Sequence, residues 1–235
     1  MNPALSVFRG ASLTRFLEEL DSGKFVWVVK RLSGNDTGLT GGHQSGVYFP
    51  RAFFEETMPE ICTTHDCNPK MVFEDVYFPS QNAELKGVTG TYYNNKFFPE
   101  RGNSKAYDEF RLTCWGGKNS PVQDPENTGS IFIFGVGRCG GGGVVGVGWV
   151  AVTLEEEKLI EEWLCQEVEP GRHIMSGLSP VLNPLNIDLP PEWSVQFPSG
   201  SEIFEFVRSK IPHMQGAGSI DRLLIKRREF EFSIF

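Results

Sequence analysis

The chain has 235 residues, and its hydrophobic content of 40% is enough for a sizeable core. Its formal net charge of −8 argues against a protein that coats nucleic acid without regard to sequence, because such binding depends on Lys and Arg side chains that neutralise phosphates. No apolar run has the length of a membrane span, and the first residues lack the pattern of a signal peptide, so we expect a cytoplasmic protein without a membrane partner.

Short helices are predicted at a few places along the chain. Apolar residues at helical spacing predict an amphipathic helix over 12–20, and residues 52–57 resemble one or two helical turns that stop before Pro59. Capping-box spacing, in which Ser or Thr precedes Glu by three residues, opens further helices at Thr153 and Ser199.

Strands dominate the rest of the chain. A high content of β-branched and aromatic residues, or alternation of polar and apolar ones, predicts strands over 25–29, 72–78, 88–93, 110–115, 131–136, 144–152 and 229–235. The glycines at 140–143 are typical of a hairpin tip. Many short strands with few helices indicate a mainly β fold (α+β), arranged as a barrel or a sandwich. With no repeat and no clear linker, we expect one domain over residues 1–235.

The five cysteines form an odd, scattered set, which we interpret as reduced thiols. Cys62, His65 and Cys67 lie close together and are all residue types that zinc accepts. No second Cys/His pair lies nearby, so a polar loop is favoured over a zinc site, and we expect no bound metal.

The stretch "KRLSGNDTGLTGGHQSGVYFP", residues 30–50, is a polar, glycine-rich interruption between two strand-like runs. A phosphate-binding P-loop would need Lys and Ser/Thr after its second Gly, but His43 and Gln44 follow here. The residues therefore predict a hydrogen-bonding arm held between two strands. Basic residues gather around it, so an acidic chain can still present a basic face locally.

Four stretches in chain order resemble the N-terminal effector-binding domain of EcoRII-type restriction endonucleases: "KRLSGNDTGLTGGHQSGVYFP", "YYNNKFF", "WGGKNSPVQDPENTG" and "FPSGSEI". The resemblance runs over nearly the whole chain. It implies a B3-like DNA-binding pseudobarrel, an open β-barrel from which two arms enter the major groove. The implied partner is double-stranded DNA, bound sequence-specifically at CCWGG or a close relative, in the cytoplasm of a bacterium or archaeon.

The resemblance also implies a parent enzyme in which this domain is covalently linked to a C-terminal nuclease domain of the PD-(D/E)XK type. That nuclease domain would follow the present chain and would need Mg²⁺. Binding by the present chain would need no cofactor, and we expect no catalytic residue in it.

The first arm, by the same resemblance, would contact DNA through polar and basic side chains. Asn and Gln pair with adenine, Lys and Arg with guanine, and Asp with cytosine. Asn35, Asp36 and Thr37 have an alternative role as turn residues that satisfy their own loop. The implied contact residues are Lys30, Arg31, Ser33, Asn35, Asp36, Thr37, His43, Gln44 and Tyr48.

The second arm would lie between Tyr93 and Trp115, where this chain is longer and less basic than the family pattern. Further basic residues near the C-terminus, Arg227 and Arg228, either reach the DNA backbone or close the barrel against the acidic helix around Glu156. The implied contact residues of the second arm are Lys96, Glu109 and Arg111 beside matched stretches, and Arg101, Asn103 and Lys105 within the longer part.

Two other functions remain open at this point. Asp75, Glu84 and Lys86 have a spacing that a self-sufficient Mg²⁺-dependent nuclease could use, although such short patterns arise often by chance. A barrel could also bind a protein or a carbohydrate, because a fold alone never fixes a function. The loop 120–129, which contains Asp124 and Glu126, favours a rigid scaffold over a catalytic site, since two prolines fix its turn.

Overall fold

The computed structural model describes residues 2–41, 46–98, 108–117, 120–140, 142–176, 199 and 202. Its internal contacts divide the chain into two compact units, Met1–Glu157 with Val168–Gly177 and Lys158–Glu167 with Leu178–Phe235. All the described strands lie in the first unit. The single domain over 1–235 stays a prediction, and the strand predicted over 229–235 lies outside the described residues.

The described strands form two sheets. The first has the order β10-β1-β8-β9-β4-β5, and the second has the order β2-β7-β6-β3. Only β4 and β9 pair in parallel among these strands. The strands are β1 (Phe25–Arg31), β2 (Val47–Phe49), β3 (Lys70–Val72), β4 (Asp75–Phe78), β5 (Ala83–Leu85), β6 (Thr89–Tyr93), β7 (Glu109–Thr113), β8 (Ile131–Arg138), β9 (Val144–Val150) and β10 (His173–Met175).

Helices are short, as expected. Ser12 caps α1 by accepting a hydrogen bond from the N–H of Arg15, and Thr153 and Glu156 bond each other reciprocally at the start of α3. None of the described helices is long and apolar enough to cross a membrane. The helices are α1 (Leu13–Leu20), α2 (Arg51–Thr57), α3 (Leu154–Leu164) and the 3₁₀ helices η1 (Pro3–Phe8), η2 (Pro59–Ile61), η3 (Pro79–Gln81), η4 (Asn95–Phe97), η7 (Pro121–Gln123) and η8 (Pro125–Asn127).

These elements confirm the mainly β fold class with short helices. The two sheets share no hydrogen-bonded strand pair, so the described architecture is open rather than a closed barrel. Outside the first unit, Ser199 and Glu202 form the reciprocal hydrogen bonds of the predicted capping box, at 2.7 and 3.4 Å.

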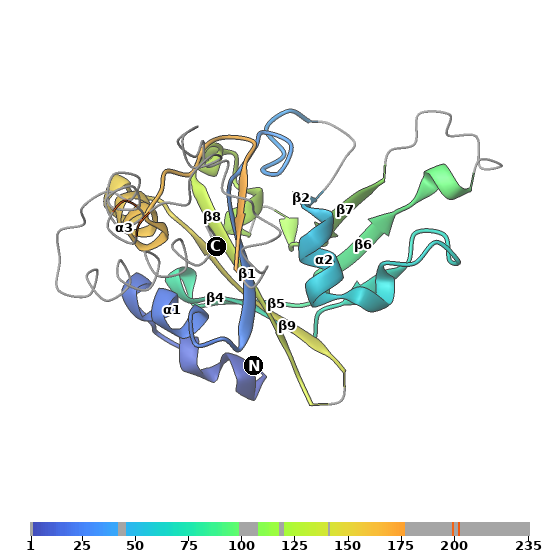
Figure 1. Cartoon of the computed structure of the whole chain (residues 1–235), viewed down its shortest axis with the longest axis horizontal. Coiled ribbons are helices and arrows are strands. Elements are labelled where there is room, and N and C mark those ends of the chain that lie inside the picture. The colour runs from blue at the N-terminus through green and yellow to red at the C-terminus, as the bar shows by residue number, and fades with distance from the viewer. Residues whose placement is uncertain are drawn as a thin grey trace. The chain divides into compact units, whose positions relative to one another are not determined.

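The main core lies between the sheets and follows the two-residue alternation of the strands. Phe132 and Phe134 of β8 point into it and pack against Phe49 and Trp115. On the other face of the first sheet, η1 and α1 lie across the strands (Figure 1). There Phe8 contacts Phe25, and Phe16 contacts Trp149, with ring centroids 5.2 and 5.4 Å apart.

The strand predicted over 72–78 is wrong as a single element. The N–H of Phe73 donates to Val88, next to the second sheet, whereas the N–H of Glu74 donates to Val144, next to the first. The chain crosses between the sheets at this point, so residues 72–78 contribute to both β3 and β4. A continuous apolar pattern cannot reveal this crossing, because both sheets accept the same residue types.

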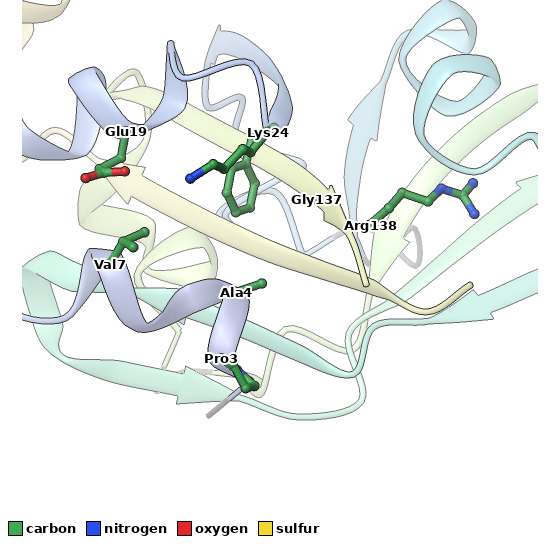
Figure 2. Close-up of a pocket in the computed structure, with 8 residues that line it drawn as sticks. Pro3, Ala4, Val7, Glu19, Lys24, Gly137 and Arg138 are labelled. Atoms are coloured by element: carbon green, nitrogen blue, oxygen red, sulfur yellow. The ribbon is translucent and has the colours of Figure 1, made fainter. Parts of the chain in front are cut away.

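A pocket of 290 Å³ opens between η1, the turn after α1 and the end of β8 (Figure 2). Glu19 and Lys24 lie on its lining, while the Arg138 side chain turns away to bond Glu60 at 2.6 Å. Lys24 directly precedes β1, whereas the polar stretch 30–50 starts at the far end of that strand. The pocket is therefore separate from that stretch.

Glycines on β8 and β9 make room for aromatic rings. A Cβ on Gly146 would lie 2.6 Å from the ring of Phe134, which is closer than real contacts allow. We expect Gly146→Ala to lower the free energy of unfolding by about 1 to 3 kcal/mol, because it overpacks the core. Gly140→Ala, in the hairpin turn with no neighbour within 4 Å, is the matched control in denaturant unfolding. Equal stability of the two variants would contradict this packing.

Candidate nucleic-acid interface

Two loops attach to neighbouring strands of the second sheet. The first arm, residues 32–46, connects β1 to β2, and the second arm, residues 94–108, connects β6 to β7. β2 and β7 lie side by side (Figure 1) and pair antiparallel. Tyr48 lies opposite Arg111 in this pairing. The first arm joins this ladder at Val47, and the second arm joins it at the other end, at Glu109. The two arms are thus anchored at opposite ends of one short ladder.

Asp36 ties the two ends of the first arm together. One carboxylate oxygen accepts from the N–H and the Oγ of Ser33, both at 2.8 Å, and the other accepts from the N–H of Tyr48 at 3.2 Å. The Lys30 ammonium donates to the same carboxylate at 2.8 Å and to the carbonyl of Tyr48 at 3.1 Å. A single carboxylate thus organises both the start and the return of the arm.

The Lys30–Asp36 pair is buried, with side-chain exposures of 8% and 2%. Burial lowers the pKa of Lys30 below its usual value, although the charge and hydrogen bond of Asp36 oppose the shift. The pair therefore depends on mutual compensation, and removing one partner of such a pair typically costs about 3 to 5 kcal/mol. In this structure both side chains, which were predicted to contact DNA, are occupied inside the protein.

Arg31 lies on the opposite face of β1 from Lys30, since neighbours on a strand alternate. Its guanidinium bonds the carbonyl of Val168 at 2.7 Å and pairs with Glu157 at 2.9 Å. Within the first arm, the hydroxyl of Thr37 bonds that of Thr128 at 2.7 Å, which connects the arm to the turn 125–129. Both residues have internal partners that hold the base of the first arm.

Arg111 connects the ladder to the first arm. It donates to the carbonyl of Gly46 at 3.0 Å and pairs with Glu109 at 3.0 Å. Gly46 has a φ of 115°, and a Cβ there would lie 2.6 Å from the carbonyl oxygen of Leu112. Only glycine allows the returning arm to approach β7 this closely.

The base of the second arm is also held by an ion pair. Lys96 pairs with Asp108 across the arm, and its ammonium lies 4.8 Å from the ring centroid of Phe97. Burial, followed by the charge of Asp108, raises the pKa of Tyr92. The Lys96–Asp108 ion pair brings the two ends of the second arm together, as Asp36 does for the first arm.

The predicted contact residues therefore have different surroundings. Ser33, Asn35, Tyr48 and Lys96 are exposed, Arg31 and Glu109 are half-buried, and Lys30, Asp36, Thr37 and Arg111 are buried. The oxygen of Asn35 accepts from Thr40 at 2.6 Å, which matches the alternative role of a turn residue. His43, Gln44, Arg101, Asn103, Lys105, Arg227 and Arg228 lie outside the described residues.

The loop 120–129 has the expected character of a rigid scaffold. Asp124 caps η8 by accepting from the N–H of Glu126 at 3.0 Å, and Asn127 bonds the carbonyl of Pro121 at 2.7 Å. The carboxylate of Asp124 is thus used locally, at the turn that contacts the first arm through Thr128.

The alternative nuclease residues do meet, at the open end of the β4–β5 hairpin. Lys86 forms ion pairs with both Asp75 and Glu84. Burial alone would raise the pKa of Asp75, but hydrogen bonds from Lys86 and from the N–H of Asn2 outweigh it, so this pKa lies below its usual value. Within the described residues, no three His, Cys, Asp or Glu side chains are placed to hold a metal ion.

His173 lies beside the candidate site, and sequence reasoning missed it. It lies on β10 opposite Lys30, and its ring contacts that of Tyr48 at 5.7 Å. Burial, then the charge of Lys30, lowers the pKa of His173 to about 4, while Asp36 opposes the shift. A lone His in a three-residue strand carries no periodic signal, so only the fold places it here.

We expect the protein to lose stability below pH 6.5, because His173 must stay neutral in the folded state and takes up a proton more readily when unfolded. Stability linked to this group is complete above pH 6.5 and falls toward pH 4. Between pH 7 and pH 5 the linked loss is about 1 kcal/mol after allowance for partial exposure. Denaturant unfolding of wild type and His173→Gln measures it, and an unchanged acid loss in the variant would contradict the assignment.

Comparison with known proteins identifies relatives of the chain. The family model described as "Restriction endonuclease EcoRII, N-terminal" matches residues 22–178. The chain is 31% identical over 230 residues to the Type II restriction enzyme EcoRII of Escherichia coli, in an alignment that covers 94% of this chain and 55% of that protein. The chain thus spans about half the length of this curated relative.

A solved structure is also similar. It is the B3 domain of the UbaLAI restriction endonuclease, crystallised as a mutant with cognate DNA, with a TM-score of 0.45 and 19% identity. The match covers 69% of this chain and 97% of that one.

Proposed function

Because the chain belongs to the family of the restriction endonuclease EcoRII N-terminal domain, we propose that it binds double-stranded DNA sequence-specifically as the recognition module of a restriction enzyme. The observation that carries the proposal is the pair of arms anchored at opposite ends of the β2–β7 ladder. Two such loops can enter one major groove from its two sides, because that groove is about 12 Å wide and admits protein elements.

The proposed target is CCWGG or a close relative. Its guanines offer O6 and N7 acceptors to basic side chains, and its central base pair offers an adenine edge to Asn or Gln. Among the described residues, Ser33, Asn35, Tyr48 and Lys96 are exposed and are the first candidates for direct contact. The resemblance adds His43, Gln44, Arg101, Asn103 and Lys105 as base or phosphate contacts, and Arg227 and Arg228 as backbone contacts.

The proposal includes the parent enzyme. Its catalytic chemistry would belong to a covalently linked nuclease domain that uses Mg²⁺, in the cytoplasm of a bacterium or archaeon. The present chain would supply DNA recognition, and that recognition would need no cofactor.

A gel shift without Mg²⁺ tests the binding proposal directly. We expect the full chain to retain a CCWGG duplex at concentrations that leave a scrambled duplex free, since each good base-edge contact is worth about 1 to 3 kcal/mol. Affinity should fall with salt, with a slope near −0.9 for each phosphate contacted. Equal retention of the two duplexes at every concentration would contradict sequence-specific binding.

Matched histidine variants sharpen that experiment. His43→Ala should cost about 1 to 3 kcal/mol on the CCWGG duplex and little on the scrambled one, if His43 touches a base edge. His65→Ala is the control, because His65 is exposed in a loop outside both arms. An equal loss on both duplexes would assign His43 to a phosphate instead.

A self-sufficient Mg²⁺ nuclease is a second candidate, and the meeting of Asp75, Glu84 and Lys86 is the observation in its favour. Mg²⁺ binding needs free carboxylate oxygens, however, and Lys86 neutralises both carboxylates here. We therefore expect no cleavage of a CCWGG duplex when Mg²⁺ is added to the full chain. Cleavage that disappears in Lys86→Ala would establish the second candidate.

A further inference from the structure

We infer that Asp36 is a positioning residue whose buried carboxylate sets the placement of both arms, and that Lys30 acts through it rather than on DNA. The inference rests on the proposed function and concerns how that site is held ready. It assigns an internal role to two side chains whose types would equally suit direct contact with bases or phosphates.

The first step is the closure of the first arm. Asp36 holds Ser33 at the start of the arm and Tyr48 just after its end, so one side chain fixes both ends of the loop. Lys30 donates a further hydrogen bond to the carbonyl of Tyr48, so Asp36 and Lys30 together bond both the N–H and the C=O of Tyr48. These bonds offset the conformational entropy that the closure of a long, glycine-rich loop costs.

The second step is the connection to the second arm. Tyr48 pairs with Arg111 across the ladder, and Arg111 bonds both Gly46 and Glu109. Glu109 is the first residue after the second arm and pairs with Tyr93, the last residue before it. A continuous series of contacts therefore runs from Asp36 to the base of the second arm.

The buried charges around Asp36 compensate one another. Lys30 and Arg111 bring two positive charges close together, since each lies within the electrostatic reach of the other. Asp36 and Glu109 compensate them, and His173 faces the pair as a neutral ring. Buried cations need such partners, because an uncompensated buried charge is costly. Lys30, at 6% exposure, would have to give up Asp36 before it could reach a phosphate.

Two readouts separate positioning from direct contact. Loss of a direct phosphate contact lowers the salt slope of binding by about 0.9, whereas loss of a positioning group leaves that slope unchanged. A positioning group also changes the local opening of both arms in the free protein, which hydrogen exchange measures without DNA.

The experiment uses the full chain and the variant Asp36→Asn, with Glu60→Gln as the control. Both changes convert a carboxylate to an amide, but Glu60 pairs with Arg138 away from the arms. Asp36→Asn should weaken binding to the CCWGG duplex by about tenfold or more, with the scrambled duplex and the salt slope unchanged. Its amide exchange should accelerate over both residues 33–41 and residues 108–113. Glu60→Gln should change none of these quantities.

The double variant Lys30→Met with Asp36→Asn covers the case in which Asp36→Asn fails to fold, because it leaves no unpaired buried charge. It should show the same selective loss and the same accelerated exchange. Unchanged exchange over residues 108–113 in a folded variant, or a salt slope reduced by about 0.9, would overturn the inference. If wild type binds both duplexes equally, the proposed function fails, while the exchange data still decide the role of Asp36.

Discussion

The structure around both arms depends on one buried ion pair. Lys30 ends the inward-facing row of β1, and a lysine in that position needs a compensating anion. Asp36 supplies it from the first turn of the arm, and in doing so its oxygens also satisfy the backbone of Ser33 and Tyr48. The same carboxylate therefore both holds the fold of the loop and compensates the charge of the buried Lys30.

The scaffold around this pair is rigid for a different reason. β8 and β9 pair along almost their whole length, and glycines on them leave space for aromatic rings of neighbouring strands in the same sheet, such as Phe25 of β1 and Phe78 of β4. Gly46 is buried at the end of the first arm, where the absence of a Cβ lets the arm return directly onto β7. These close contacts hold neighbouring strands of the first sheet together, and they hold the end of the first arm against β7.

Sequence patterns predicted the regular elements well, because caps and periodicity are local. Ser12 and Thr153 mark the starts of α1 and α3, and the paired runs of β8 and β9 are evident from their composition. The crossing at Phe73 and Glu74 was missed, since it depends on which sheet accepts each backbone bond. β5 and β10 were missed because three residues are too few for a period to show.

The sequence predicted which residues belong to the candidate site, but not which of their side chains are buried. A basic and polar stretch indicated DNA contact for Lys30, Asp36 and Arg111 alike, yet all three are buried and bond the protein itself. The sequence does contain a signal for the burial of Lys30. Lys30 follows Val28 by two residues on β1, and residues two apart on a strand share a face. No comparable local signal exists for Arg111, whose burial depends on the returning arm.

The most direct test is a crystal structure of the chain with a CCWGG duplex. We expect the arms to lie in the major groove while the Asp36 carboxylate keeps its bonds to Ser33, Tyr48 and Lys30. A complex in which the Lys30 ammonium has left Asp36 to contact a base or a phosphate, or in which the duplex binds away from the β2–β7 ladder, would contradict this expectation.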